Sequence, residues 1–247
     1  MKPCWICGTL ADSREHKIKK STLRALYGRG PYIGSNGLYH AKDGTIAVVQ
    51  GPNANRLKYS PVICAACNNS RTQLADEAFE FLVDYWLHFR AEIEASRVLD
   101  LCRIFPQSSD VMSAELFRFF AKHLGCDLAE SMFTVPQDLV LIAGGTFVTS
   151  RLQVSFALDR DPIDVPIPVE RTAGIGTLLT TVRNLKSRDD PRYIWSSHVG
   201  ALRMFYWYDC RPDPQLGASW AGACAKVAVG MVTPESNPRD ASFIKPA

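Results

Sequence analysis

The longest regular pattern of apolar and polar positions in the chain begins at Arg71. Apolar side chains recur there at steps of three and four residues, with acidic side chains between them. This spacing places the apolar groups on one face of an α-helix and the acidic groups on the other. The pattern therefore predicts a long amphipathic helix with an apolar stripe formed by Leu74, Ala78, Phe81, Leu82, Tyr85, Phe89 and Ile93.

Shorter elements precede this helix. Residues Ser21 to Tyr27 are predicted to form a short helix that starts at the serine and stops at the glycines that follow. Residues Leu38 to Lys42 and Thr45 to Gln50 flank Asp43-Gly44, a dipeptide that accepts positive φ at both central positions of a tight turn. This arrangement predicts a β-hairpin, and Leu57 to Ile63 is expected to follow as an extended segment.

The second half of the chain is predicted to contain one further helix and then strands. After an irregular stretch from Ser96 to Asp110, residues Ser113 to Leu124 form an amphipathic pattern that is expected to end at Gly125. Apolar and polar residues then alternate, which predicts strands separated by turns rich in proline and glycine. The predicted strands are Leu152 to Leu158, Tyr193 to Ser197, Ala201 to Asp209 and Cys224 to Val232, with Val165-Pro166-Ile167-Pro168 as an edge strand or extended loop.

These elements indicate the α+β class and two domains. A chain of 247 residues, 47% apolar and 21% charged, can bury a core, and its length suits one small and one medium domain. We expect residues 1–97 to form the first domain and residues 98–247 to form a mixed, mainly antiparallel β domain with helices. No apolar stretch is long enough for a signal peptide or a membrane span, so we expect a cytoplasmic protein without membrane contacts.

Half of the cysteines lie in two Cys-x-x-Cys pairs, Cys4 with Cys7 and Cys64 with Cys67. Two pairs of identical spacing supply the four sulfurs of a closed tetrahedral site, so we predict a structural Zn²⁺ there. The other cysteines stand singly among apolar residues and are expected to be reduced, buried side chains rather than a second metal site. They are Cys102, Cys126, Cys210 and Cys224.

The net charge of +3 is unevenly distributed. Residues 1–72 carry eleven Lys and Arg against three Asp and Glu, a net +8, whereas the remainder carries 17 basic and 22 acidic residues, a net −5. Such an excess attracts a polyanion, so we predict a nucleic-acid partner, with DNA as the first choice. A solvated basic face is the other interpretation. The side chains expected to contact phosphates are Lys17, Lys19, Lys20 and Arg71.

A carboxylate, an imidazole and a carboxamide stand near the cysteine pairs in the sequence: Glu15, His16 and Asn68. These groups suit metal-assisted hydrolysis of a phosphodiester. Histidine, with an ordinary pKa of about 6.5, can take the proton from an attacking water. Glu15 and Asn68 each offer an oxygen to a hard ion such as Mg²⁺ or Mn²⁺, whereas four thiolates leave zinc no open position. A lone Glu-His pair is more often a surface loop, and Asn68 also suits a helix cap.

In their order, Cys4-Trp5-Ile6-Cys7, Glu15-His16 and Cys64-Ala65-Ala66-Cys67-Asn68 resemble the motif of HNH endonucleases of the ββα-metal class, in the branch with zinc knuckles. The likeness extends over residues 1–95 and includes uncharacterised bacterial and phage members. It implies a treble-clef-like, zinc-bound ββα fold in which His16 is the general base and Glu15 and Asn68 bind one divalent ion. It also implies products with a 5′-phosphate and a 3′-hydroxyl.

The resemblance leaves the middle residue of the motif open. The family usually has an asparagine there that braces the loop of the catalytic histidine, and the choices are Asn55, slightly preferred, Asn53 and His40. Glu15 stands where the family more often has Asp. The interval between His16 and the second cysteine pair is longer than in compact members, which implies an insertion.

Two hypotheses result. The first is a metal-dependent HNH endonuclease acting on DNA, which as a homodimer could cut both strands together. The second is a non-catalytic zinc-knuckle protein that binds nucleic acid or serves as a scaffold. The second half adds no chemical clue, because the aromatic run from Phe205 to Tyr208 is expected in the core rather than stacked on bases. Structural roles are also expected for His88, His123 and His198.

Overall fold

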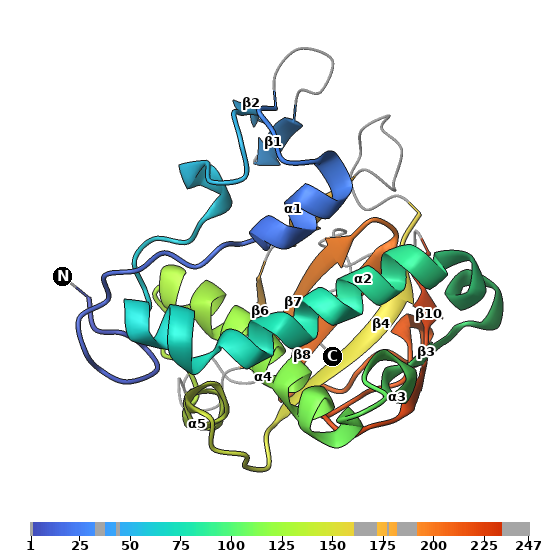
Figure 1. Cartoon of the computed structure of the whole chain (residues 1–247). Helices are drawn as coiled ribbons and strands as arrows, with labels where there is room; N and C mark the ends of the chain where they lie inside the picture. The colour runs from blue at the N-terminus through green and yellow to red at the C-terminus, as the bar shows by residue number, and fades with distance from the viewer. Residues whose placement is uncertain are drawn as a thin grey trace.

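The structure is a computed structural model that describes residues 2–32, 38–42, 45–160, 172–176, 178–181 and 192–233. As predicted, the fold is mixed α+β, with helices across one face of a β-sheet and a smaller N-terminal unit beside them (Figure 1). No helix within these residues is long and apolar enough to cross a membrane. The Asp43-Gly44 turn and the edge strand expected at 165–168 lie outside the described residues.

The N-terminal unit is built on two extended segments that run antiparallel. One backbone bridge joins Ser13 to Ile63, and a second joins His16 to Lys58. The connection between the segments folds over a small core of its own. Its elements are α1 (Lys20–Tyr27), the antiparallel pair β1 (Leu38–Lys42) and β2 (Thr45–Val49), and the short turn η2 (Asn55–Leu57). The short helix and the paired strands of the hairpin are thus confirmed.

The larger sheet has the strand order β10-β4-β8-β7-β5, and β6 also pairs with β7. Among the described pairs, the pairing is antiparallel except between β10 and β4. The strands are β4 (Leu152–Leu158), β5 (Ala173–Ile175), β6 (Leu179–Thr181), β7 (Arg192–Val199), β8 (Leu202–Tyr208) and β10 (Gly230–Met231). Sequence analysis found the longer strands but not β5 and β6.

The aromatic run in β8 is buried, as predicted. Side chains alternate between the two faces of a strand, so Tyr206 and Tyr208 join the core beneath the helices. Phe205 and Trp207 pack on the opposite face, where the Trp207 indole donates a hydrogen bond to the hydroxyl of Ser155. These aromatic rings therefore stabilise the sheet and are not exposed to a ligand.

Two long helices cover the sheet (Figure 1). The predicted helix α2 (Gln73–Ser96) follows a π-helical segment, η3 (Ala66–Arg71), and packs against α4 (Ser109–Glu130) through stacked Phe79 and Phe119 rings. One continuous hydrophobic core joins both helices to the sheet. Packing therefore runs across the boundary that we placed at residue 97.

Helix α4 is longer than predicted, because it continues through Gly125, where we expected it to end. This glycine makes room for an aromatic ring: a Cβ at Gly125 would lie 2.4 Å from the ring of Trp5. Trp5 stands between the cysteines of the first pair, so this contact docks that pair on α4. The requirement for glycine comes from a residue far away in the sequence, which is why it was taken for a stop signal.

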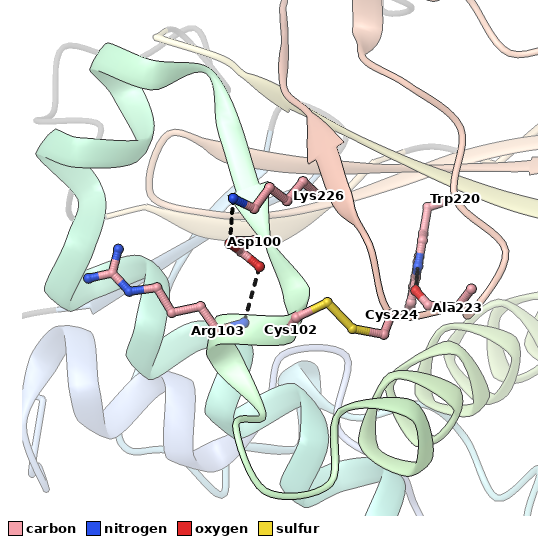
Figure 2. Close-up of a disulfide and its surroundings, with 7 residues drawn as sticks. All are labelled: Asp100, Cys102, Arg103, Trp220, Ala223, Cys224 and Lys226. Carbon is pink, nitrogen blue, oxygen red and sulfur yellow. Dashed lines mark hydrogen bonds and ion pairs between the residues drawn. A yellow bond between two sulfur atoms is a disulfide. The ribbon is translucent and has the colours of Figure 1, made fainter.

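The expectation that Cys102 and Cys224 are single reduced thiols is wrong, because they form a disulfide in the structure (Figure 2). Pairing of β3 (Val98–Asp100) with β9 (Lys226–Ala228) brings them together. Asp100 reinforces this corner, since it accepts the amide of Arg103 at the start of α3 (Leu101–Ile104) and pairs with Lys226 at 3.4 Å. The cysteines are 122 residues apart, so local sequence carries no sign of the bond.

We predict that Gly125→Ala destabilises the protein by about 1 kcal/mol, although alanine is the better helix former by a similar amount. The added methyl group has to displace Trp5, and overpacking of this kind costs about 1–3 kcal/mol. Urea unfolding followed by circular dichroism measures the change. Gly51→Ala is the control, because nothing lies within 4 Å of its Cβ position. A more stable Gly125→Ala protein would contradict the Trp5 contact.

Candidate zinc centre and the ion pairs beside it

The two cysteine pairs converge on one point. The Sγ atoms of Cys4, Cys7, Cys64 and Cys67 all lie within 4.8 Å of one another. A tetrahedral zinc with bonds of about 2.3 Å places its sulfurs about 3.8 Å apart. The Sγ atoms of Cys7 and Cys64 are 3.6 Å apart, close to that spacing. The four residues therefore fit a closed four-sulfur metal site, as the sequence predicted.

Backbone geometry and nearby donors prepare both pairs for a metal. Gly8 has a φ of +77°, in the left-handed region, which lets the chain turn back after the first pair. In the second pair, the amide of Cys67 donates to the Sγ of Cys64, and Arg71 donates to the Sγ of Cys67. A hydrogen bond with the Thr9 hydroxyl lowers the pKa of Cys7 to about 6, which favours the thiolate that binds metal.

The centre is packed against the helices of the second half. Ile6 and Ile63 share a buried apolar cluster with Ala143 of α5 (Gln137–Gly144), and Val62 shares another with Cys126 of α4. The amide of Ser60 donates to Glu130 at the end of α4. A metal ion bound by these cysteines would join the start of the N-terminal unit to its second extended segment, next to α4 and α5.

Asn68 lies within η3, directly after the last cysteine. Its Nδ2 donates to the hydroxyl of Ser13 at 2.9 Å, which links the start of the helical segment to the first extended segment. Its Oδ1 is buried and has no hydrogen-bond partner among the described residues. The residue that precedes α2 as its cap is Thr72, so Asn68 does not cap this helix.

His16 is half-buried on the extended segment, opposite Lys58. Its Nε2 is buried and has no hydrogen-bond partner within the part of the chain that the structure describes. Burial, helped by the charges of Lys58 and Lys19, lowers the pKa of His16 to about 4. The ring is therefore neutral at pH 7.

Asn55 is tied to the segment that carries His16. Arg14 donates to the Oδ1 of Asn55 at 2.8 Å and to its carbonyl at 3.2 Å. The same guanidinium donates to the carbonyl of Tyr59. Asn53 and Asn55 are both exposed, and His40 lies in β1. Of these three choices for the middle motif position, Asn55 is the one bonded to Arg14, the residue that precedes Glu15.

Glu15 lies between two lysines. Its Oε1 is 2.8 Å from the Nζ of Lys19, and its Oε2 is 2.8 Å from the Nζ of Lys122 in α4. Asp76 of α2 completes the cluster, with its Oδ1 at 2.7 Å from Lys19 and 3.0 Å from Lys122. We call these four residues the ion quartet. Burial alone would raise the pKa of Glu15, but the two ammonium charges outweigh it and hold the pKa well below its ordinary value.

The ion quartet does not fit the divalent ion that the resemblance implies. Each carboxylate oxygen of Glu15 already contacts an ammonium group, whereas the Oδ1 of Asn68 has no partner among the described residues. An ion shared by Glu15 and Asn68 would have to displace Lys122, which is only 1% exposed. In the described structure, Glu15 is therefore a partner of lysines and not a vacant metal ligand.

Two of the four basic side chains that we expected to contact phosphates form ion pairs within the protein. Lys17 pairs with Glu130 at 2.9 Å and Lys19 belongs to the ion quartet, so both are engaged within the protein. Lys20 begins α1, and Arg71 is exposed even as it contacts Cys67. The sequence analysis did not single out a further exposed set that forms no ion pair among the described residues, namely Arg24, Arg29 and Arg56.

His123 has the structural role that the sequence predicted. Its Nε2 donates to the carbonyl of Lys17 at 3.0 Å, and its Nδ1 accepts from the hydroxyl of Tyr206 at 3.1 Å. Burial lowers the pKa of His123 to about 3, so this ring stays neutral. It connects α4 to the segment that follows His16 and to the sheet.

The fold and the site together define an α+β protein with a four-cysteine cluster that could hold a metal ion. Comparisons with models of protein families, with curated proteins and with solved structures find no match.

We predict that the protein binds one zinc ion per chain and that Cys64→Ser abolishes this binding. Serine cannot replace a thiolate ligand, and loss of a structural zinc removes folding free energy as well as the ion. Metal analysis of the purified variants gives the stoichiometry. Cys210→Ser, which lies outside the cluster, should retain the zinc. Equal zinc contents in the two variants would contradict the site.

Proposed function

We propose that the N-terminal unit is a zinc-bound endonuclease of the HNH type that hydrolyses phosphodiester bonds in DNA, with His16 as the general base. The observation that carries this proposal is the neutral His16 ring, whose Nε2 is buried and has no hydrogen-bond partner among the described residues. A neutral imidazole accepts the proton of a water molecule that attacks phosphorus when substrate and water reach that nitrogen. Ser13, on the same segment, bridges to the residue before Cys64, which ties this base to the zinc centre.

The chain order of the unit supports the same proposal. Two antiparallel extended segments are followed by a helical segment that starts at the second cysteine pair, and the hairpin β1–β2 lies in the connection. Asn68 contributes an amide oxygen that is buried and has no partner in the described structure. Binding of Mg²⁺ or Mn²⁺, which the sequence favoured, would require Glu15 to leave its lysines.

A nucleic-acid substrate is supported by the surface of the unit. The exposed arginines of α1, of the following loop and of η2 have no acidic partners among the described residues. On the hairpin, Tyr39 and Val48 stand opposite each other in the register and are 62% and 52% exposed. Arginines neutralise phosphates, and an exposed tyrosine offers a face on which a base can stack.

The second candidate is a zinc-knuckle protein that binds nucleic acid without cutting it. The observation that favours it is the pairing of the Glu15 carboxylate with Lys19 and Lys122. This pairing leaves His16 without the carboxylate-bound ion that the resemblance implies. This protein would share the basic surface and the metal centre, and would differ from the first candidate only in having no hydrolytic rate.

We predict that His16→Ala lowers the rate of plasmid nicking by about 10²-fold or more, because a general base contributes a factor of that order. Salt-dependent binding to the same DNA should persist. His88→Ala is the matched control, since His88 is exposed on α2 and distant in sequence from the unit's segments. DNA binding without any nicking, the same in both variants, would favour the second candidate.

We also predict that Arg29→Ala combined with Arg56→Ala weakens binding to duplex DNA and flattens its salt dependence. Each lost phosphate contact removes about 0.9 from the slope of log K against log salt. Fluorescence anisotropy over a salt series measures this slope. Lys226→Ala is the control, because that lysine pairs with Asp100 beside the disulfide. An unchanged slope in the double variant would exclude these arginines from the interface.

The cytoplasmic location expected from the sequence stays a proposal. Disulfides such as Cys102–Cys224 form mainly in oxidising compartments and are rare in the cytosol. Zinc thiolates and a disulfide in one chain require that the two sets of cysteines be kept apart. Here the fold does so, since the disulfide joins α3 to the segment before β9 and the zinc cysteines lie in the N-terminal unit.

A further inference from the structure

The ion quartet is a closed arrangement of two carboxylates and two ammonium groups. Lys19 and Lys122 each lie between the carboxylates of Glu15 and Asp76, at the N–O distances given above, which run from 2.7 to 3.0 Å. The carboxylates receive two positive charges, which is the charge of one divalent cation. The quartet is therefore neutral as a whole, as buried ionic groups require.

The position of Lys122 makes this arrangement durable. The residue belongs to the middle of α4, whose side chains are buried on all sides from Glu115 to Leu128. Its burial would lower the pKa, but Glu15 and Asp76 reverse this and raise it, so the amine stays charged. Moving Glu15 away would leave a buried ammonium with one carboxylate fewer, and breaking a buried ion pair in this way is strongly unfavourable.

We infer that Lys122, together with Lys19, replaces a divalent ion at Glu15, so that this carboxylate is held by the protein's own cations. Lys122 is then a positioning residue: it fixes Glu15, and through it the segment that carries His16. The inference concerns the site of the proposed nuclease, but it is about ion binding alone and holds or fails whether or not the protein cuts nucleic acid.

The first test is Mn²⁺ binding to the zinc-loaded full-length protein in the absence of nucleic acid, measured by electron paramagnetic resonance. We expect wild-type protein and Glu15→Gln to give the same binding curve, because Glu15 contributes no ligand. A bound Mn²⁺ in the wild type that is lost in Glu15→Gln would overturn the inference. Neither outcome depends on a folded Lys122 variant.

The second test compares Lys122→Met with Lys122→Arg. The methionine variant removes one cation and leaves Glu15 and Asp76 with excess negative charge, so its Mn²⁺ affinity should rise by about tenfold or more over wild type. Lys122→Arg keeps the charge and should bind as wild type does. Adding Glu15→Gln to Lys122→Met should cancel the gain. A folded Lys122→Met protein that binds no more Mn²⁺ than Lys122→Arg would overturn the exchange of lysine for metal.

Cleavage assays separate this inference from the proposed function. If wild-type protein nicks DNA and shows no Glu15-dependent Mn²⁺, both stand. If it never nicks DNA and the Mn²⁺ curves still agree, the nuclease proposal fails while the inference about Lys122 stands. If nicking is lost in His16→Ala and Mn²⁺ is bound through Glu15, the nuclease stands and the inference fails.

Discussion

The buried charge of Lys122 is the constraint around which the two halves of this protein are arranged. An ammonium group in the interior of a long helix must have carboxylates beside it. It receives one from α2, Asp76, and one from the N-terminal unit, Glu15. The helix can therefore be buried on all sides only when the segment before His16 lies against it. The quartet links the folding of that segment to the core of the second half.

Other residues along α4 also contact the N-terminal unit and the elements next to it. Arg118 donates to the carbonyls of Arg71 and Ala143, at the ends of η3 and near the end of α5. His123 holds the carbonyl of Lys17, and Gly125 leaves room for Trp5. Arg118 thus contacts η3 and α5, whereas His123 and Gly125 contact two different segments of the N-terminal unit. The helix is thus a platform for the metal centre, which explains why so many polar groups stand on a helix that is otherwise apolar.

Local patterns in the sequence were enough to predict the short helix, the hairpin strands, α2 and the main strands, because side-chain periodicity depends only on neighbours. The metal centre was also predictable, since the cysteine spacing within each pair is local. The ion quartet was not. Asp76 is an acidic residue in the first turn of α2 and Lys122 is a lysine within α4, and neither carries a local sign of the contact with Glu15. Only the packing of α4 beneath the N-terminal unit brings them to Glu15, and the same long-range packing explains Gly125 and the Cys102–Cys224 disulfide.

The motif Glu15-His16 shows how adjacency in sequence can mislead about a site. Both residues lie on an extended segment, held by backbone hydrogen bonds from Tyr59 to Glu15 and from Lys17 to Leu57. Successive side chains of an extended chain point to opposite sides. Glu15 meets the helices and their lysines, whereas His16 is paired with Lys58 and borders a small cavity that Phe119 and His123 of α4 also line. The carboxylate thus serves the interface with α4, and the Nε2 of the imidazole has no hydrogen-bond partner among the described residues. In this short motif, Glu15 therefore has a structural role and His16 is the candidate for chemistry.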